Sequence, residues 1–184
     1  METRGIRVSS QPYFTVRRLS MLAALTALCH VGRLVFQVIP NVQPMTTILL
    51  LIALTIGTVD GMVVAGASLI ISNIFLGMGP WTIYQLITYL LIMLLTGALR
   101  PVYRKLAAYP MARRIVFAVY ALLIGFLYGF IISVFSARMY GVSNFLVYYL
   151  QGVSFDVLHA VGNAGFFIIL EPILVPLMTK RRLN

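Results

Sequence analysis

The sequence predicts an all-α integral membrane protein, a bundle of six transmembrane helices with both termini in the cytoplasm. Of its 184 residues, 61% are hydrophobic and 10% are charged, whereas a soluble domain carries about 25% charged residues. Apolar runs near the length of about 20 residues that a transmembrane helix needs fill most of the chain. Basic residues gather between these runs. We therefore expect one membrane domain over residues 1–184, with no linker.

The first span is predicted over Tyr13–Ile39, after a cytoplasmic N-terminal segment of residues 1–12. Arg17 and Arg18 mark its cytoplasmic end, and Arg33 is expected to extend its side chain to the opposite surface. No small-residue cleavage site follows the apolar run. We therefore expect this span to be retained rather than removed as a signal peptide.

Residues 45–75 are predicted to form two helices rather than one. A single helix of about 30 residues would be about 45 Å long, against a hydrocarbon core of about 30 Å, and it would bury Asp60 in its middle. Two short, tilted helices, Met45–Val59 and Met62–Phe75, avoid both problems by meeting at Asp60-Gly61.

The rest of the chain is predicted to hold three more spans. They cover about Trp81–Leu99, Ile115–Phe135 and Gly152–Leu177, and the last is expected to follow an interfacial aromatic segment, Phe145–Gln151, and to be kinked by Pro172 and Pro176. Residues 100–114 are predicted to be the main cytoplasmic loop, residues 136–144 an outer loop, and residues 179–184 a basic cytoplasmic tail.

The distribution of positive charge decides between five and six spans. The net charge is +10, and Lys and Arg collect on the cytoplasmic side of membrane proteins. Six spans place twelve of the fourteen basic residues inside and leave only Arg33 and Arg138 outside. Five spans would move the basic cluster of residues 100–114 outside. Because these clusters flank spans, we do not expect nucleic-acid binding.

Small residues recur at helical spacing in two places. Ala23 and Ala27 form an AxxxA motif, and Gly57, Gly61 and Ala65 form a second row. Small residues allow helix backbones to approach closely in lipid. We expect the Gly57 row to pack inside the bundle, whereas the alanine pair could serve either internal packing or an external helical partner.

Polar groups inside the last span form a second pattern. Asp156 and His159 are three residues apart, and Asn163 continues the same helical face. Ionisable groups in a membrane usually face a cavity or a partner. Two interpretations stay open: a polar stripe that faces a ligand, or a structural Asp–His pair. His30 is expected to be structural, and Glu171 to pair with a basic residue.

The predicted outer side is rich in amide and aromatic side chains. Tyr and Trp are ordinary at a membrane interface, but amides in a turn bracketed by prolines indicate an apolar pocket with a few directed hydrogen bonds. The side chains in question are Asn41, Gln43, Trp81, Tyr84, Gln85, Tyr140, Asn144, Tyr148 and Tyr149.

Motifs of known catalytic types do not occur in the sequence. It holds no GxSxG, HExxH or Walker lysine loop, and its two histidines lack a second carboxylate at metal-ligand spacing. We therefore predict no enzyme, no metal site and no nucleotide hydrolysis by this chain.

Two blocks resemble a known family. PNVQPMTTI (residues 40–48) and LGMGPWTIYQ (residues 76–85), in a small, basic, six-span protein with AxxxA on its first span, resemble the substrate-binding S components of energy-coupling factor (ECF) vitamin transporters. The resemblance covers essentially the whole chain. It is greatest to the cobalamin type.

The resemblance implies a multi-pass protein of the prokaryotic plasma membrane that binds cobalamin from outside with high affinity. It also implies docking through Ala23 and Ala27 on a transmembrane coupling subunit, while two cytoplasmic ATPase subunits use ATP to drive a cycle in which the chain topples in the bilayer. No cofactor is implied in this chain itself. The implied substrate-binding residues are Asn41, Gln43, Trp81, Tyr84, Gln85, Tyr148, Asp156 and His159.

Three other functions stay open at this stage. The chain could be an S component for another vitamin or a small nutrient such as a modified-base precursor. It could be a small membrane enzyme that uses Asp156 and His159 as an acid–base pair. It could also be a structural membrane partner without a ligand.

Overall fold

The computed structural model describes residues 15–183, with the backbone alone for residues 180–183, and every regular element in that part is a helix. The expected N-terminal segment, residues 1–12, and the side chains of the expected basic tail beyond Thr179 lie outside the described residues. The elements are α1 (Val16–Val35), η1 (Phe36–Val38), α2 (Met45–Thr55), α3 (Thr58–Leu76), α4 (Trp81–Ala98), α5 (Arg100–Lys105), η2 (Leu106–Ala108), α6 (Pro110–Met139) and α7 (Phe145–Leu183).

Five of the described helices are long and apolar enough to cross a membrane: α1 with η1, α3, α4, α6, and α7 as far as Thr179. The sixth apolar helix, α2, has 11 residues and is therefore about 16 Å long, half of a hydrocarbon core. The predicted helical class is confirmed for the described residues, and their long apolar helices are compatible with a multi-pass membrane protein. Among the described residues, the structure has five helices of spanning length and one short helix.

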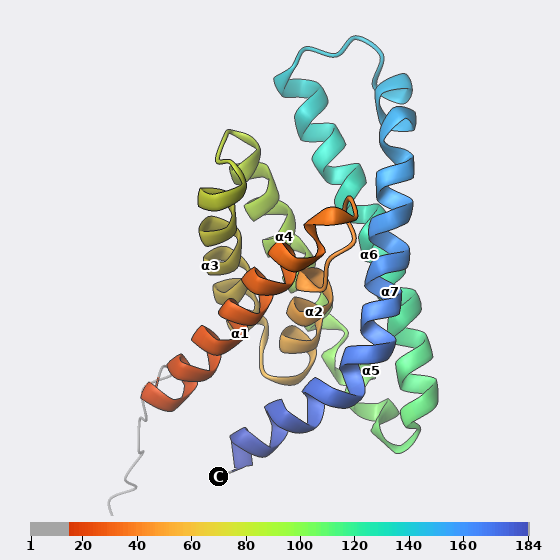
Figure 1. Cartoon of the computed structure of the whole chain (residues 1–184). Helices are drawn as coiled ribbons and strands as arrows, with labels where there is room; N and C mark the ends of the chain where they lie inside the picture. Colours follow the sequence, from red (N-terminus) through yellow and green to blue (C-terminus); the bar gives the residue numbers. More distant parts are fainter. Residues whose placement is uncertain (1–14, 184) are drawn as a thin grey trace, which may run out of the picture.

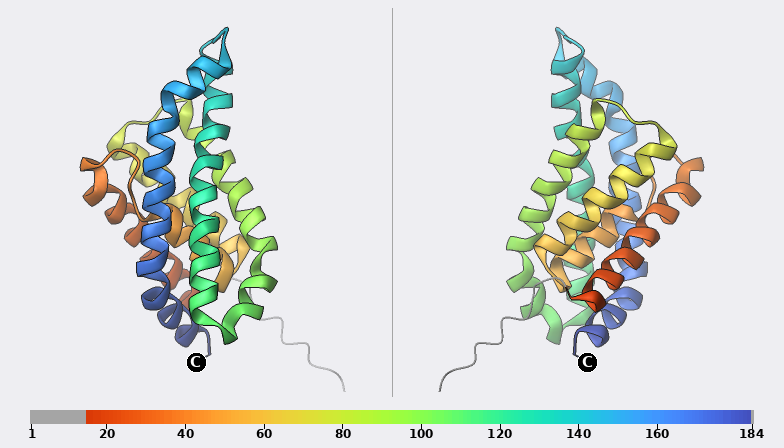
Figure 2. Two further views of the ribbon diagram at one scale, coloured as in Figure 1. Left: turned by 90° about the vertical axis from the view of Figure 1, so that its right-hand side faces the viewer. Right: turned by 90° about the vertical axis from the view of Figure 1, so that its left-hand side faces the viewer.

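The helices are arranged as two antiparallel pairs around a short central helix (Figures 1 and 2). The helices α6 and α7 pack along each other, α3 packs on α4, and α1 crosses α3. A Cβ atom at Gly125 would collide with the backbone of Ala160, so a glycine at this point of α6 permits the close approach of α7. The beginning of α1 and the end of α7 lie at the same end of the molecule (Figure 1).

The central helix is α2, and its residues from Met45 to Leu54 are all buried. It contacts α1, α3, α4, α5 and α7. A helix that is hydrophobic all round belongs in a protein core or in a membrane, and with 11 residues α2 is too short to span a membrane, which fits its place in the core.

The break between α2 and α3 was predicted correctly in kind but four residues too late in position. The helix α2 ends at Thr55 and α3 begins at Thr58, so Asp60 lies in the first turn of α3 rather than at a break. A carboxylate is favourable there because the helix N-terminus carries partial positive charge. Arg18 also pairs with it, with Arg18 Nε 2.7 Å from Asp60 Oδ1.

A second arginine closes the end of α2. Arg100 Nη2 donates to the carbonyl oxygens of Thr55 at 2.8 Å and Ile56 at 2.6 Å, which would otherwise lack a helical partner. Arg18 and Arg100 therefore have internal roles, although the sequence suggested only topological ones for them.

Two local boundaries differ from the prediction, whereas the cytoplasmic location of residues 100–114 stays a prediction. The predicted loop of residues 100–114 contains α5 and η2, and α6 already begins at Pro110. Residues 145–151 are not a separate interfacial segment, because α7 continues without a break through Gly152. The C-terminal part of α7 bends away from the axis of the preceding part (Figure 1). Pro172 and Pro176 lie inside the helix, as expected for a proline kink.

Candidate functional site

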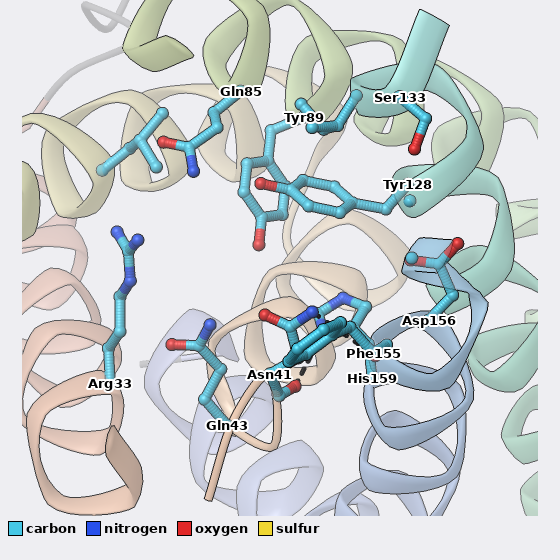
Figure 3. A pocket seen from close by; sticks show the side chains of 14 residues that line it. Arg33, Asn41, Gln43, Gln85, Tyr89, Tyr128, Ser133, Phe155, Asp156 and His159 are labelled. Atoms are coloured by element: carbon cyan, nitrogen blue, oxygen red, sulfur yellow. Dashed lines mark hydrogen bonds between the residues drawn. The ribbon is translucent and has the colours of Figure 1, made fainter. Parts of the chain in front are cut away.

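A polar cavity of about 240 Å³ lies among the helices α1, α3, α4, α6 and α7 (Figure 3). The segment that joins η1 to α2 also lines it. Five of the eight substrate-binding residues suggested by the sequence line it, namely Asn41, Gln43, Gln85, Asp156 and His159. The other lining residues are Arg33, Leu69, Tyr89, Tyr128, Gly129, Ile132, Ser133, Gly152 and Phe155.

The proline-bracketed segment forms one wall through a tight turn. Val42 N donates to Ile39 O at 3.2 Å, with Pro40 second in the turn and Asn41 third at φ 58°. Proline at the second position and a residue of positive φ at the third are the pattern of a type II turn, and Asn tolerates that backbone. The turn fixes the Asn41 carbonyl at the cavity edge.

His159 is held from both sides of its ring. Its Nδ1 donates to Asn41 O at 2.9 Å, and its Nε2 lies 3.3 Å from Thr46 Oγ1. Thr46 Oγ1 is also 3.0 Å from the hydroxyl of Tyr89. This chain of hydrogen bonds connects α7, the turn, α2 and α4. It fixes the imidazole as part of the cavity wall.

Arg33 is a cavity residue rather than the surface residue that was expected. Its Nη1 donates to Ser72 Oγ at 2.5 Å and to Asn73 Oδ1 at 2.9 Å. Asn73 Nδ2 in turn donates to Gln85 Oε1 at 2.9 Å. These hydrogen bonds place the guanidinium beside neutral side chains of α3, so its positive charge remains available to the cavity.

Asp156 lies on the opposite side of the cavity from Arg33 (Figure 3). Its side chain is buried, at 6% exposure, and its Oδ2 has no hydrogen-bond partner within the described part of the chain. A Cβ atom at Gly129 of α6 would collide with this carboxylate, so glycine makes the room for it. A buried polar atom without a partner is costly, and a bound ligand that donates a hydrogen bond would remove that cost.

Three of the predicted residues do not line the cavity. Trp81 is 40% exposed, and Tyr84 stacks on Phe135 of α6 with ring centroids 4.9 Å apart. Tyr148 lies half-buried in the first turn of α7. The sequence missed Arg33, Tyr89, Tyr128 and Ser133, although Tyr89 could have been found because it follows Gln85 by four residues on one helical face.

The second predicted surface is a groove between α1 and α3. Ala23 and Ala27 are exposed and line it, around a volume of about 470 Å³. The other lining residues are mostly apolar, such as Leu19 and Val63, and include His30. Gly61 and Ala65, in contrast, are buried, so that part of the second small-residue row packs inside the bundle as expected.

Among the residues that the structure describes, no group of three or more His, Cys, Asp or Glu side chains is placed to hold a metal ion. Comparisons of the chain with protein-family models, with curated proteins and with solved structures gave no match.

Proposed function

We propose that the chain is the high-affinity substrate-binding subunit of an ATP-driven vitamin uptake transporter of the ECF type, with cobalamin as the first candidate vitamin. The observation that carries the proposal is the polar cavity, because five residues suggested by the resemblance meet around it. A concave pocket with a few directed polar groups is the usual form of a small-molecule site. The proposed transport cycle is inferred from the resemblance.

The cavity favours a ligand with two different polar ends. The Arg33 guanidinium can bind an anionic or strongly accepting group, since its protein partners Ser72 and Asn73 are neutral. Asp156 Oδ2 can accept a hydrogen bond from an N–H or O–H group of the ligand. Charge-assisted hydrogen bonds of this kind are stronger than neutral ones.

The cavity volume limits how the ligand is held. At about 240 Å³ it lies below the usual range of about 300–1,000 Å³ for small-molecule sites. A corrinoid is several times larger, so cobalamin would insert one peripheral group unless the turn at Asn41 moves away from α7. A smaller vitamin would fit with less movement and is the alternative within the same class.

The groove between α1 and α3 supports docking on a coupling subunit. Its apolar lining with exposed Ala23 and Ala27 suits close packing of a partner helix in lipid. In this proposal the chain has six membrane segments, with α2 as the short one, and both ends face the cytoplasm. The ATPase subunits would act there.

A membrane enzyme is the second candidate, because Asp156 and His159 line the same cavity. Variants Asp156→Asn and His159→Gln separate the two functions. A transport subunit would lose ligand binding in both variants, whereas an enzyme would keep binding and lose turnover. The substrate screened for turnover is the same vitamin that binds.

The proposed docking is tested by Ala23→Leu and Ala27→Leu. Each should abolish uptake by cells that express the complete transporter and should leave vitamin binding by the purified chain unchanged. Val119→Leu is the matched control, because Val119 is an exposed α6 residue outside the groove. Normal uptake by both alanine variants would contradict the docking proposal.

A further inference from the structure

A second cavity, of about 330 Å³, lies among α2, α5, η2, α6 and α7. Its apolar wall includes Leu54, Ala107 and Val175, and its polar edge includes Tyr103, Arg104 and Arg113. It shares no lining residue with the ligand cavity. The short helix α5 connects α4 to α6 at the end of the molecule where α7 ends (Figure 1).

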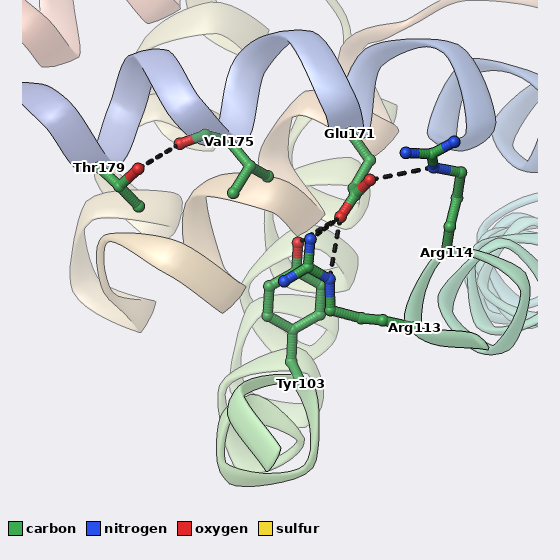
Figure 4. Close-up of polar contacts among 6 residues, drawn as sticks. All are labelled: Tyr103, Arg113, Arg114, Glu171, Val175 and Thr179. Carbon is green, nitrogen blue, oxygen red and sulfur yellow. Dashed lines mark hydrogen bonds and ion pairs between the residues drawn. The ribbon is translucent and has the colours of Figure 1, made fainter. Parts of the chain in front are cut away.

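The acidic group nearest this edge, the Glu171 carboxylate, already accepts hydrogen bonds at both of its oxygens. Glu171 is 1% exposed, and its Oε1 accepts from Arg113 and, at 3.1 Å, from the Tyr103 hydroxyl. Its Oε2 accepts from Arg114 Nε at 3.1 Å (Figure 4). Burial raises the pKa of Tyr103, and the Glu171 carboxylate raises it further, so the phenol remains a donor. Two arginines thus share one carboxylate, which leaves one positive charge in excess.

Arg104 adds a second positive charge to the same edge. No ion pair reaches it within residues 15–179, where side chains are described. Of the other acidic residues in that range, Asp60 pairs with Arg18 and Asp156 lines the ligand cavity. The edge of this second cavity is therefore positive, while its walls are mainly apolar.

We propose that this second cavity binds an anionic phospholipid. The phosphate of the lipid would contact the guanidinium groups of Arg104 and Arg113. Part of one acyl chain would lie against Leu54 and Val175. Charge complementarity favours this occupant, because basic pockets between transmembrane helices bind anionic headgroups. The wall is too apolar for a free phosphate ion, which would leave Leu54, Ala107 and Val175 facing water. This proposal does not depend on the transport function.

The test is native mass spectrometry of the full chain in detergent, titrated with phosphatidylglycerol, with phosphatidylcholine and with sn-glycerol 3-phosphate. We expect one phosphatidylglycerol to bind at least tenfold more tightly than phosphatidylcholine, and no retention of glycerol phosphate. Equal binding of the two lipids would overturn the proposal. Retention of glycerol phosphate at the affinity of phosphatidylglycerol would overturn the role of the apolar wall.

Three variants locate the lipid. Arg104→Gln removes the charge at the edge, and Ala107→Trp fills the cavity without a change of charge, so each should weaken phosphatidylglycerol binding at least tenfold. Lys105→Gln is the matched control, because it removes a neighbouring charge that does not line the cavity, and it should change the affinity less than twofold. Equal losses in Arg104→Gln and Lys105→Gln would show non-specific attraction and contradict the site. Unchanged binding by Ala107→Trp would contradict it independently.

Discussion

Two buried carboxylates on the same helix have opposite surroundings. Glu171 and Asp156 are 15 residues apart on α7, a distance of about 22 Å along the helix. Glu171 accepts hydrogen bonds from two arginines and a tyrosine, whereas Asp156 has an oxygen without a partner in the described part of the chain. Glu171 therefore joins α5, α6 and α7, whereas Asp156 keeps an oxygen that can accept a further hydrogen bond, as the proposed ligand site requires.

The largest expected effect is on stability, in Glu171→Gln. Loss of the charge leaves two half-buried arginines without their counter-ion, so the cost should approach but not exceed about 3–5 kcal/mol, the cost of breaking a fully buried ion pair. The measurement is chemical or thermal unfolding of the detergent-solubilised chain. Asp156→Asn is the matched control and should change the free energy of unfolding by less than about 1 kcal/mol. Equal destabilisation by the two variants would remove the contrast.

The converse effect is expected on binding. Asp156→Asn keeps the shape of the side chain but removes its charge, so vitamin affinity should fall at least tenfold, about 1.4 kcal/mol. Isothermal titration calorimetry measures it. The folded fraction of Glu171→Gln should bind the same vitamin within twofold of the wild type. A loss in Glu171→Gln as large as in Asp156→Asn would mean that the two carboxylates are not functionally distinct.

Gly129→Ala should weaken binding severalfold although it removes no polar group. The added methyl group would collide with the Asp156 carboxylate and displace it. Gly165→Ala on α7 has open space around the new methyl group, so it should leave affinity unchanged and stabilise the helix by up to about 1 kcal/mol. Calorimetry and unfolding of both variants provide the comparison, and normal binding by Gly129→Ala would count against the role of Asp156.

The smallest effect is expected at an aromatic residue outside the cavity. Tyr84 stacks on Phe135 and does not line the cavity, so Tyr84→Phe should change vitamin affinity less than twofold. Tyr89→Phe removes a hydroxyl that lies 3.0 Å from Thr46 Oγ1 in the hydrogen-bond chain to His159 and should weaken binding more. Calorimetric titration of both variants ranks them, and the reverse order would mean that the ligand contacts the outer aromatic residues instead.

The helical class was predicted from local pattern, and five of the cavity residues were predicted from local pattern together with the resemblance. Uniform apolar runs indicate membrane helices, and Asp156 and His159 share a face by their spacing alone. The position of Arg33 at the cavity could not be predicted from local pattern, since its hydrogen-bond partners Ser72 and Asn73 are 39 and 40 residues away.

The same limit explains the misplaced helix break. The sequence suggested that Asp60 must lie at an interruption, because an unpaired carboxylate inside a membrane helix is costly. Arg18, on another helix, pairs with it, so that cost does not arise. Trp81, Tyr84 and Tyr148 were expected at the site because they lie on the predicted outer side, where the resemblance implies a ligand, but the rotation of α4 and α7 determines which side chains face inward.

The most direct test is calorimetric titration of the purified chain in detergent with cobalamin and then with a panel of smaller vitamins, in parallel with Asp156→Asn and Arg33→Gln. We predict saturable binding of one vitamin at one site per chain, weakened at least tenfold in both variants. A vitamin that binds the wild type and both variants equally would show that the cavity is not the binding site. No saturable binding of any vitamin, alone or after co-purification with a coupling subunit, would contradict the proposed function itself.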